Sequence, residues 1–343
     1  MIVIFTSEND LSTLEVAKWL NHFKQEFYII NPSEEIFKFK KITNEGIFFT
    51  HNILKKDINL LNAKACWWRR TGLGVKNFVN GSLPKELEIN GMDLKELISG
   101  RKSLIHSEFN DLKEYIFDSV YNNCKINMGS PRLFGLNRLT TLDIAKSKGL
   151  KIPYYEVISN TNQINSSSTI EDKFVTKAVS NGIYHQIKNK SYYSYTELQY
   201  KKDYCNQDIK VFPSLIMNLV DKKYEIRTFY LDGHFFSMAI FSQSNSQTKV
   251  DFRKYSESKP NKNEPFRLPK NIEKKLESVF KEIGLNSGSA DLIVDLNNDF
   301  VFLEINPIGQ YGMTSEPCNY NLDRLIAEYL INGRISKQDR VRK

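Results

Sequence analysis

Three oxygen-bearing side chains near the end of the chain have the types and spacing of a metal site. Glu304 and Asn306 are two residues apart in an apolar, strand-like segment, so their side chains share one face. Asp291 lies in the preceding apolar segment, and Asn297-Asn298-Asp299 predicts a tight turn between the two. We therefore expect the three side chains to converge across a hairpin. Carboxylate and amide oxygens suit Mg²⁺, which also binds substrate phosphates.

The segment that carries Glu304 is otherwise strongly apolar. Alternation predicts that Leu303 and Ile305 point away from the face of Glu304. The alternative is a solvated hairpin edge that holds polar residues by chance. That alternative is weakened because such an apolar strand should be covered, and an unpaired buried carboxylate is costly.

Two positions upstream carry side chains that can bind phosphate. Lys177 ends the strand-like segment FVTK and precedes a polar loop with glycine, although the GxxxxGK[ST] pattern of a P-loop is missing. Glu225 and Arg227 alternate onto one strand face, where a planar guanidinium suits a carboxylate or a phosphate. A cross-strand ion pair, which is common, is the alternative for this second position.

The elements that must position these residues begin with a β-α-β pattern. An apolar strand at Ile2–Thr6 is followed by capping residues at Asn9–Ser12 and by apolar residues at helical spacing up to Phe23. Strand character returns at Phe27–Ile30, and this order predicts an open α/β layer. Further strands are expected at 46–50 and 63–68, and helices at 84–123 and 138–148.

The second half of the chain is richer in strands. Apolar runs predict strands at 173–179, at 214–220, on both sides of an Asp232-Gly233 hairpin turn, at 289–296 and at 300–305. Helices are expected at 269–284 and 322–331, and residues 160–168 are predicted to form a polar loop. The tyrosine-rich stretch Tyr192–Tyr204 is either a lid or a partner-binding surface, or the packed face of a small subdomain.

Composition excludes several classes of protein. Of 343 residues, 41% are hydrophobic and 26% charged, which is typical of a soluble globular protein. No apolar stretch approaches the roughly 20 residues of a membrane span, and the first ten residues predict no signal peptide. Four cysteines without paired spacing predict reduced thiols and a cytoplasmic location: Cys66, Cys124, Cys205 and Cys318.

The net charge is +8, from 48 Lys+Arg against 40 Asp+Glu. Nucleic acid, a nucleotide or an acidic polypeptide could each explain this excess, and so could solubility alone. No helix-turn-helix, RNA-recognition or zinc-finger signature supports nucleic acid as the partner. The charge by itself does not decide between a nucleotide, an acidic polypeptide and solubility.

The ordered motifs resemble those of the ATP-grasp ligases. The resemblance is carried, in chain order, by NRLTTLDIAKSKGLKIP, FVTKAV, SLIMNLVDKKYEIRTFYLDG and SADLIVDLNNDFVFLEINPIGQYG. The chain is most similar to the graspetide (microviridin-like, grasp-with-spasm type) peptide maturases, on WWRRTG, DFRKYS and FLEINPIGQYGMTSEPCNYNLDRLIAEYL. The resemblance implies an α/β ATP-grasp fold with an N-terminal pre-ATP-grasp domain (1–125), a central subdomain (126–212) and a C-terminal subdomain (213–343).

The resemblance also implies roles for individual residues. Phosphates would be bound by Lys177 and by Arg138, which stands where relatives have a lysine. Adenine would be held by the backbone of Met217-Asn218-Leu219-Val220, where many relatives have Gln-Glu, and sandwiched by Ile293 and Leu303. Glu225 would bind the ribose, and Asp291, Glu304 and Asn306 would bind Mg²⁺. Arg227 would contact the phosphate or acyl phosphate, and Arg253 the γ-phosphate and the acceptor. Arg69 and Arg70 would contact the acidic substrate. For Arg69 and Arg70 the alternative is two solvated arginines after two core indoles.

The implied activity needs ATP and Mg²⁺. An Asp or Glu side chain of a ribosomal precursor peptide is phosphorylated, and a Ser or Thr hydroxyl or a Lys amine then displaces phosphate to close an ester (macrolactone) or amide ring, releasing ADP and phosphate. The resemblance further implies recognition of a leader segment apart from an acidic, hydroxyl-rich core, and a homodimer. The basic excess then belongs partly to ATP and partly to the acidic peptide.

Two other functions compete with this interpretation. An ATP-grasp ligase that joins an amino acid to a protein C-terminus would keep the same nucleotide site and change the acceptor pocket. A non-catalytic nucleic-acid-binding protein would use the basic charge alone, and steep salt dependence of binding would favour it.

Overall fold

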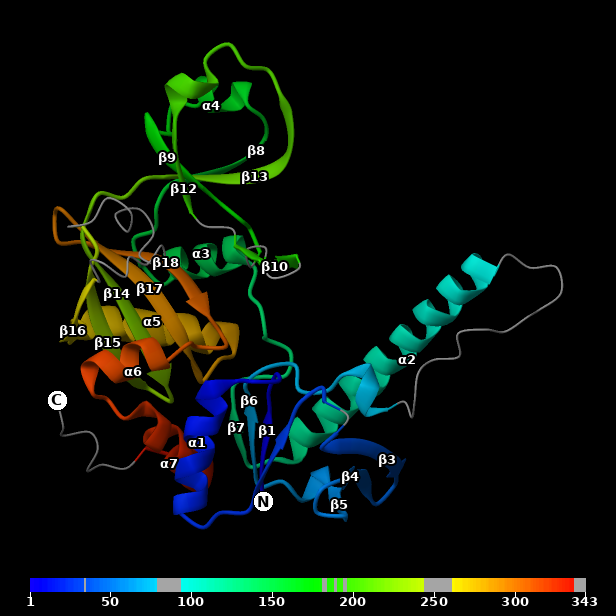
Figure 1. Cartoon of the computed structure of the whole chain (residues 1–343). Helices are drawn as coiled ribbons and strands as arrows, with labels where there is room; N and C mark the ends of the chain where they lie inside the picture. Colours follow the sequence, from blue (N-terminus) through cyan, green and yellow to red (C-terminus); the bar gives the residue numbers. More distant parts are fainter. Residues whose placement is uncertain are drawn as a thin grey trace. The chain divides into compact units, whose positions relative to one another are not determined.

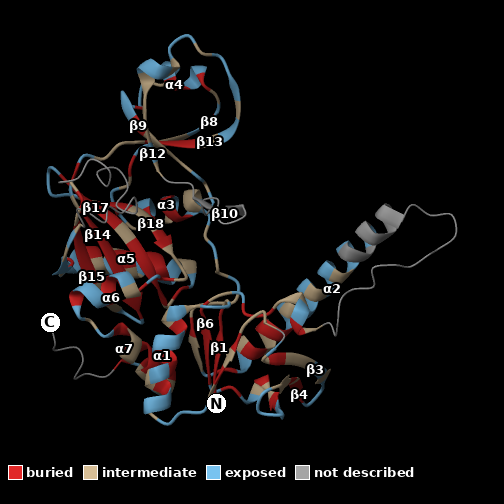
Figure 2. Cartoon of the chain, viewed as in Figure 1, coloured by how far each residue is buried: buried red, intermediate tan, exposed pale blue. Residues whose placement is uncertain are grey.

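The computed structural model describes residues 1–33, 35–78, 94–180, 184–187, 190–193, 196–243 and 261–335. The chain forms two compact units. Unit 1 comprises Met1–Phe134 and Asn321–Lys343, and unit 2 comprises Gly135–Tyr320. Buried strands mark the core of each unit (Figure 2). The division into three parts after residues 125 and 212 stays a prediction.

Unit 1 is built on a parallel sheet with the strand order β2-β1-β6-β7 (Figure 1). Helix α1 (Leu11–His22) connects β1 to β2, so the predicted β-α-β start is confirmed. The fully buried strand β1 has apolar side chains on both faces, which is typical of parallel sheets. The four strands are β1 (Ile2–Phe5), β2 (Phe27–Ile30), β6 (Ala65–Trp68) and β7 (Ile126–Met128).

A second sheet and two further helices complete unit 1. The antiparallel strands follow each other in the chain: β3 (Phe37–Thr43), β4 (Gly46–His51) and β5 (Lys56–Asn59). Helix α2 (Leu94–Asn123) is 30 residues long, and the earlier part of its predicted range, 84–93, lies outside the described residues. Helix α7 (Leu322–Asn332) packs against α1, so both ends of the chain contribute to unit 1.

The smaller sheet of unit 2 has the order β12-β9-β13-β8, and its neighbouring strands are antiparallel. Residues 160–168, predicted to be a polar loop, contain the short helix α4 (Asn162–Ser166). The prediction was wrong because one apolar residue, Ile164, is buried in the core beneath this sheet and anchors the turn. The strands are β8 (Tyr155–Asn160), β9 (Lys173–Lys177), β12 (Glu197–Tyr200) and β13 (Lys210–Asn218).

The larger sheet of unit 2 has the order β16-β15-β14-β17-β18 and is antiparallel throughout. One face packs on helix α5 (Lys270–Ile283), where Tyr230 stacks on Phe280 at 4.4 Å between ring centroids. Asp232 and Gly233 both have positive φ, as the predicted two-residue hairpin turn requires. The strands are β14 (Lys222–Leu231), β15 (His234–Phe241), β16 (Lys262–Phe266), β17 (Ser287–Asp295) and β18 (Phe300–Asn306).

Several shorter elements connect these layers. Helix α3 (Arg138–Ser147) precedes the smaller sheet of unit 2, and helix α6 (Gly312–Cys318) follows the larger one. Tyr204, from the tyrosine-rich stretch, packs against the core cluster around Phe174, which fits the packed-face alternative for that residue. The remaining elements are the hairpin β10 (Tyr184–Ile187) and β11 (Lys190–Tyr193) and the 3₁₀ turns Leu60–Asn62, Val75–Asn77 and Lys201–Tyr204.

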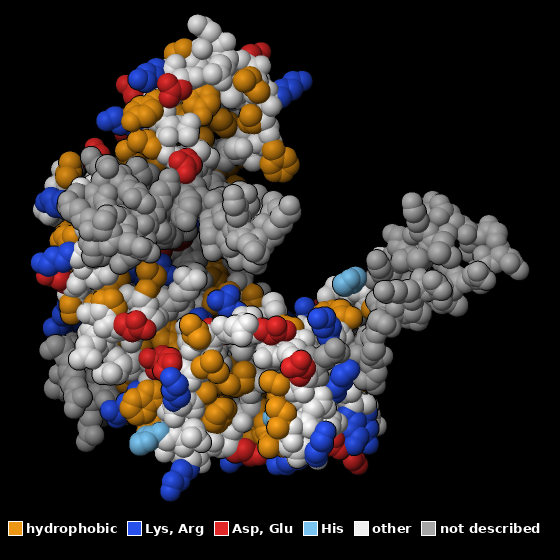
Figure 3. Space-filling view, in the orientation of Figure 1, with side chains coloured by type: hydrophobic (Ala, Val, Ile, Leu, Met, Phe, Trp, Pro, Cys, Tyr) orange, Lys and Arg blue, Asp and Glu red, His pale blue; other side chains and the backbone are white. Residues whose placement is uncertain are grey.

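The surface carries both signs of charge. On the face drawn in Figure 3, basic and acidic side chains are interspersed rather than gathered in one basic field. Within the described residues, no helix is long and apolar enough to cross a bilayer. All four cysteines are free, as predicted, and three of them are buried.

Candidate active site

A cleft in unit 2 collects most of the residues that the sequence singled out. About 770 Å³ of non-atom space lies within this cleft, part of it open solvent. Ten of its lining residues were predicted: Lys177, Met217, Asn218, Leu219, Val220, Glu225, Asp291, Ile293, Leu303 and Glu304. Four others were not: Pro153, Val175, Thr196 and Lys222. Of these, Val175 carried a signal, because it alternates with Lys177 on the same strand.

A β-bulge determines what strand β18 contributes. Asp291 pairs with Glu304 and the next residue, Leu292, pairs with Phe302, so Leu303 is an extra residue on β18. Leu303 and Glu304 consequently both line the cleft. The prediction that Leu303 points away from Glu304 was therefore wrong, because simple alternation does not hold across a bulge.

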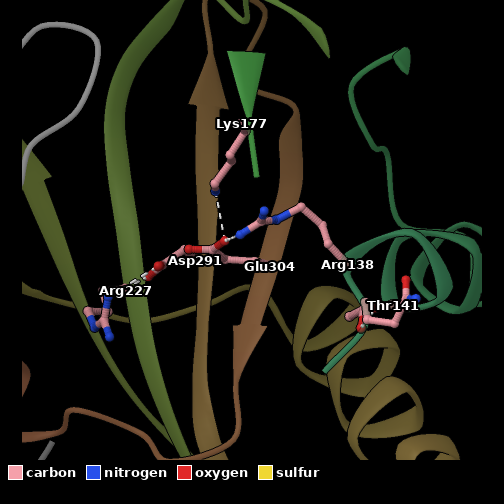
Figure 4. A network of polar contacts seen from close by, with 7 residues as sticks. Arg138, Thr141, Lys177, Arg227, Asp291 and Glu304 are labelled. Carbon is pink, nitrogen blue, oxygen red and sulfur yellow. Dashed lines mark hydrogen bonds and ion pairs between the residues drawn. The ribbon is translucent and has the colours of Figure 1, made fainter. Parts of the chain in front are cut away.

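Two cations converge on one carboxylate oxygen at the cleft. Nζ of Lys177 and Nη2 of Arg138 each lie 2.7 Å from Oε2 of Glu304 (Figure 4). Lys177 comes from the end of β9 and Arg138 from the first turn of α3, where the Asn137 side chain caps the helix by accepting from two backbone N–H groups. The remaining Arg138 nitrogens, Nε and Nη1, are buried and have no hydrogen-bond partner among the described residues.

The charge state of Glu304 follows from this arrangement. Burial by itself raises the pKa of a carboxyl group. The charges of Lys177 and Arg138, together with their hydrogen bonds, outweigh burial and hold the pKa of Glu304 well below its usual range. The Glu304 carboxylate is therefore ionised, with two cations beside it, and its oxygens are of the kind that bind metal ions.

A second ion pair lies next to the first on the sheet. Arg227 and Asp291 are direct cross-strand neighbours on β14 and β17. Nη1 of Arg227 contacts both carboxylate oxygens of Asp291, at 3.2 and 3.1 Å, while Nε is buried without a partner among the described residues. The ion pair that was the alternative for Arg227 is thus present, and it involves one of the predicted metal ligands.

The three predicted metal ligands share one sheet face. Asn306 pairs with Ser289 and Glu304 pairs with Asp291, so the two carboxylates and the amide project from neighbouring positions. Oδ1 of Asn306 accepts a hydrogen bond from the backbone of Ile308 at 3.1 Å, which fixes the side chain. No cluster of three or more His, Cys, Asp or Glu suited to a metal occurs in the described parts of the chain, so this set depends on the amide. Its hard oxygens fit Mg²⁺.

In the predicted adenine linker, the side chain of Asn218 is hydrogen-bonded to the protein backbone. Asn218 accepts from the backbone N–H of Glu171 at 3.1 Å and donates to the carbonyl of Thr169 at 3.0 Å. These bonds tie the 169–171 segment to β13. Asn218 lines the cleft, and any hydrogen bonding to a base would depend on backbone groups of residues 217–220, as the sequence predicted.

A buried lysine beside the linker was not indicated by the sequence. Lys222 donates to Oε1 of Glu225 at 2.6 Å, and Ser242 donates to the same oxygen at 2.9 Å. Burial raises the pKa of Glu225, and the Lys222 charge opposes that shift without cancelling it. Sequence alternation does not predict this contact, because Lys222 and Glu225 are three residues apart in a strand.

Six predicted residues are not among the described residues that line the cleft. Arg138 and Arg227 contact the lining residues Glu304 and Asp291, and Asn306 lies on β18 with Glu304. The other three are Arg69, Arg70 and Arg253. Arg69 belongs to unit 1 and is only 2% exposed, with Nε 3.1 Å from Oδ2 of Asp10. It is therefore not a solvated arginine. Arg70 is 35% exposed and lies 3.8 Å from the same oxygen. Arg253 lies outside the described residues.

The network around Asp10 keeps this carboxylate ionised. Burial tends to raise the pKa of Asp10, but Arg69 and the hydroxyls of Thr6 and Thr13 hold it below its usual value. Trp67 and Trp68 are both buried, as the alternative interpretation of this motif expected.

Comparison with known proteins identifies the fold. No model of a known protein family matches the sequence, and no curated protein matches it. A RiPP-associated ATP-grasp ligase of Chryseobacterium gregarium, solved with ADP and with a leader and core peptide, is 20% identical, matches over 97% of each chain and has a TM-score of 0.74. Macrocyclase MdnC of Microcystis aeruginosa, bound with precursor peptide MdnA, is 22% identical over 96% of this chain and 99% of its own, with a TM-score of 0.70.

A third similar structure contains both a nucleotide and a metal. ATP-grasp ligase PsnB, complexed with a phosphomimetic precursor variant, Mg and ADP, is 14% identical and matches over 96% of this chain and 97% of its own, with a TM-score of 0.67. These likenesses show that the chain has the ATP-grasp fold, as its sequence predicted.

Proposed function

We propose that this protein is an ADP-forming ATP-grasp ligase that closes rings in a ribosomal precursor peptide, as a graspetide synthetase. One observation carries the proposal: in an ATP-grasp fold, Arg138 and Lys177 converge on Glu304 at the wall of a cleft. Solved proteins of the same fold that are bound with a precursor peptide, or with a leader and core peptide, support the choice of substrate class.

In the proposed nucleotide site, phosphates, ribose and base bind to successive parts of the cleft. Lys177 and Arg138 bind phosphate oxygens, which would also satisfy the buried nitrogens of Arg138 that have no partner among the described residues. Ile293 and Leu303 contact the base, whose edge bonds to the backbone of residues 217–220, and Glu225 accepts from the ribose.

Asp291, Glu304 and Asn306 are the residues that would hold Mg²⁺. The ion would neutralise charge on the transferred phosphoryl group and orient it. Nucleotide binding would therefore exchange partners. Lys177 and Arg138, which contact Glu304, would bind phosphate oxygens instead, and the Glu304 carboxylate would then bind the metal ion.

The proposed chemistry has two steps. A side-chain carboxylate of the precursor attacks the γ-phosphorus of ATP, the bond to the β-phosphate oxygen breaks, and ADP leaves. A hydroxyl or amine of the same peptide then attacks the acyl carbon, loses its proton, and expels phosphate. Each ring closure removes the elements of one water from the peptide. Arg227 is proposed to face the phosphate or acyl phosphate, with its buried Nε available for an oxygen ligand.

The proposed substrate is an acidic, hydroxyl-rich core peptide that follows a leader. Of the two arginines predicted to contact it, Arg70 is the better candidate, because Arg69 is buried against Asp10. The free cysteines are consistent with the proposed cytoplasmic location.

Mass spectrometry of the precursor tests this function. Incubation of the protein with ATP, Mg²⁺ and a candidate precursor from a neighbouring reading frame should lower the peptide mass by one water per ring, with an equivalent amount of ADP formed. A gain of amino-acid mass on a protein C-terminus would instead identify the rival ligase. ADP formation without either change would rule out both.

We also propose that two copies associate through helix α2. Its residues Leu104, Leu112 and Tyr115 are 61%, 38% and 53% exposed and recur at helical spacing. Light scattering should give a dimer for the wild type and a monomer for Leu104→Glu/Leu112→Glu, with the exposed Leu54→Glu as the control. A monomeric wild type would overturn the assignment.

A further inference from the structure

We propose that Lys222 is a positioning residue that makes the cleft selective for the ribose of its nucleotide, by holding Glu225 as the acceptor of a sugar hydroxyl. This inference rests on the proposed function, because it assumes that the cleft binds a nucleoside triphosphate. The family resemblance implies ribose binding by Glu225, and this inference adds Lys222, which the sequence did not indicate.

A bulge at the start of β14 places Lys222 in the cleft. Lys222 pairs with Asp295 and Tyr224 pairs with the adjacent Val294, so Lys223 is the extra residue between them. The bulge turns Lys222, instead of Lys223, onto the face that carries Glu225. Lys222 accordingly lines the cleft, while the exposed Lys223 donates to Oδ1 of Asn298 at 2.7 Å.

The pair is buried to a degree that is unusual for charged side chains. The side chains of Lys222 and Glu225 are 6% and 9% exposed. A buried ion pair typically adds little stability compared with apolar side chains of the same size, because both ions lose their hydration. A role in recognition explains why such a pair stands in the wall of a cleft.

The position of Glu225 along the cleft matches a sugar. Glu225 pairs directly with Ile293, which is proposed to contact the base, and Arg227, two residues further along β14, faces Asp291 at the metal end. The carboxylate thus lies between the base-binding and phosphate-binding parts. Lys222 and Ser242 both contact Oε1, which orients the group. An ionised carboxylate only accepts hydrogen bonds, so it suits the vicinal hydroxyls of ribose.

Nucleotide binding measured without the peptide tests the inference. Calorimetry with Mg²⁺ and either ATP or 2′-deoxy-ATP should give a preference for ATP of roughly 10-fold or more in the wild type, since a hydrogen bond to a charged group is lost. Lys222→Met should reduce that preference to within about 2-fold, because Glu225 is no longer held. Lys223→Met is the matched control and should keep the wild-type preference.

Several outcomes would overturn the inference. A wild type that binds both nucleotides equally well, or a Lys222→Met variant that binds both more weakly by the same factor, leaves Lys222 with a structural role only. If Lys222→Met does not fold, Lys222→Met/Glu225→Gln removes both charges together and should likewise lose the preference; retention of the preference would contradict us. A wild type that binds neither nucleotide refutes the proposed function as well, whereas binding without preference refutes this inference alone.

Discussion

The ammonium nitrogen of Lys177 lies 2.7 Å from Oε2 of Glu304, although the two residues are expected to bind different ligands. Lys177 is predicted to bind phosphate and Glu304 to bind Mg²⁺. The charges of Lys177 and Glu304 neutralise each other, and Arg138 also contacts Glu304. Buried charges need such compensation, because an isolated ion away from water is costly. The three charges therefore compensate one another, although Nε and Nη1 of Arg138 have no hydrogen-bond partner among the described residues.

The first prediction concerns Glu304 as a metal ligand. Glu304→Gln removes one carboxylate charge while keeping the shape, so dehydration of the precursor should fall by about 100-fold or more, since metal-assisted charge stabilisation is worth several kcal/mol. Circular dichroism should confirm that the variant is folded. Glu328→Gln, which alters another Glu–Arg pair at Arg324, should keep normal turnover. Normal turnover of Glu304→Gln would show that the metal assignment is wrong.

The second prediction concerns phosphate binding by Lys177. Lys177→Ala should weaken ATP binding by roughly 10- to 100-fold in calorimetry, the range expected for one charge-assisted hydrogen bond. Lys173→Ala removes an exposed lysine from the same strand and should leave affinity unchanged. Equal affinity of both variants for ATP would exclude the phosphate role.

The third prediction concerns pH. The pKa of Glu304 in the folded protein lies below its ordinary value of 4.5. Its contribution to folding stability is therefore complete above the unfolded-state pKa and is lost as the pH falls toward the folded-state pKa. The melting temperature of the wild type should drop more steeply than that of Glu304→Gln below about pH 4.5. Parallel curves for the two proteins would mean that the ion pairs add no stability.

The fourth prediction concerns the bulged residue. Leu303→Ala keeps the backbone but removes apolar contact from the cleft, so ATP affinity should decrease by about 10-fold, as for loss of one buried leucine side chain. Leu296→Ala changes a leucine that is exposed on the same hairpin and serves as the control. An unaltered affinity in Leu303→Ala would remove this residue from the base-binding site.

Sequence alone predicts the parts of the cleft that depend on local pattern. Glu304, Asn306 and Lys177 stand out because period-2 alternation and apolar surroundings identify strands with polar exceptions. The hairpin of β14 and β15 follows from Asp232-Gly233 in the same way. These features can be predicted from residues that are close together in the sequence.

Other parts of the cleft depend on pairing between strands. Leu303 and Lys222 were misplaced or overlooked because each depends on a bulge, and a bulge is a mismatch between two strands rather than a property of one. The contact of Arg138 with Glu304 spans 166 residues, and only the family resemblance indicated a role for Arg138. The same limit applies to α4, where a single buried contact by Ile164 outweighs polar composition.

Helix α7 belongs to unit 1 although it follows unit 2 in the chain, so unit 2 is a guest domain inserted into unit 1, its host. Two peptide connections, at 134–135 and at 320–321, join the two units. Since α7 buries Leu322, Leu325 and Ile326 in the host, truncation before it should destabilise the host while leaving the guest's sheets complete. Along the chain, unit 2 thus lies between the two segments of unit 1. Unit 1 can complete its fold only after unit 2 has been synthesised.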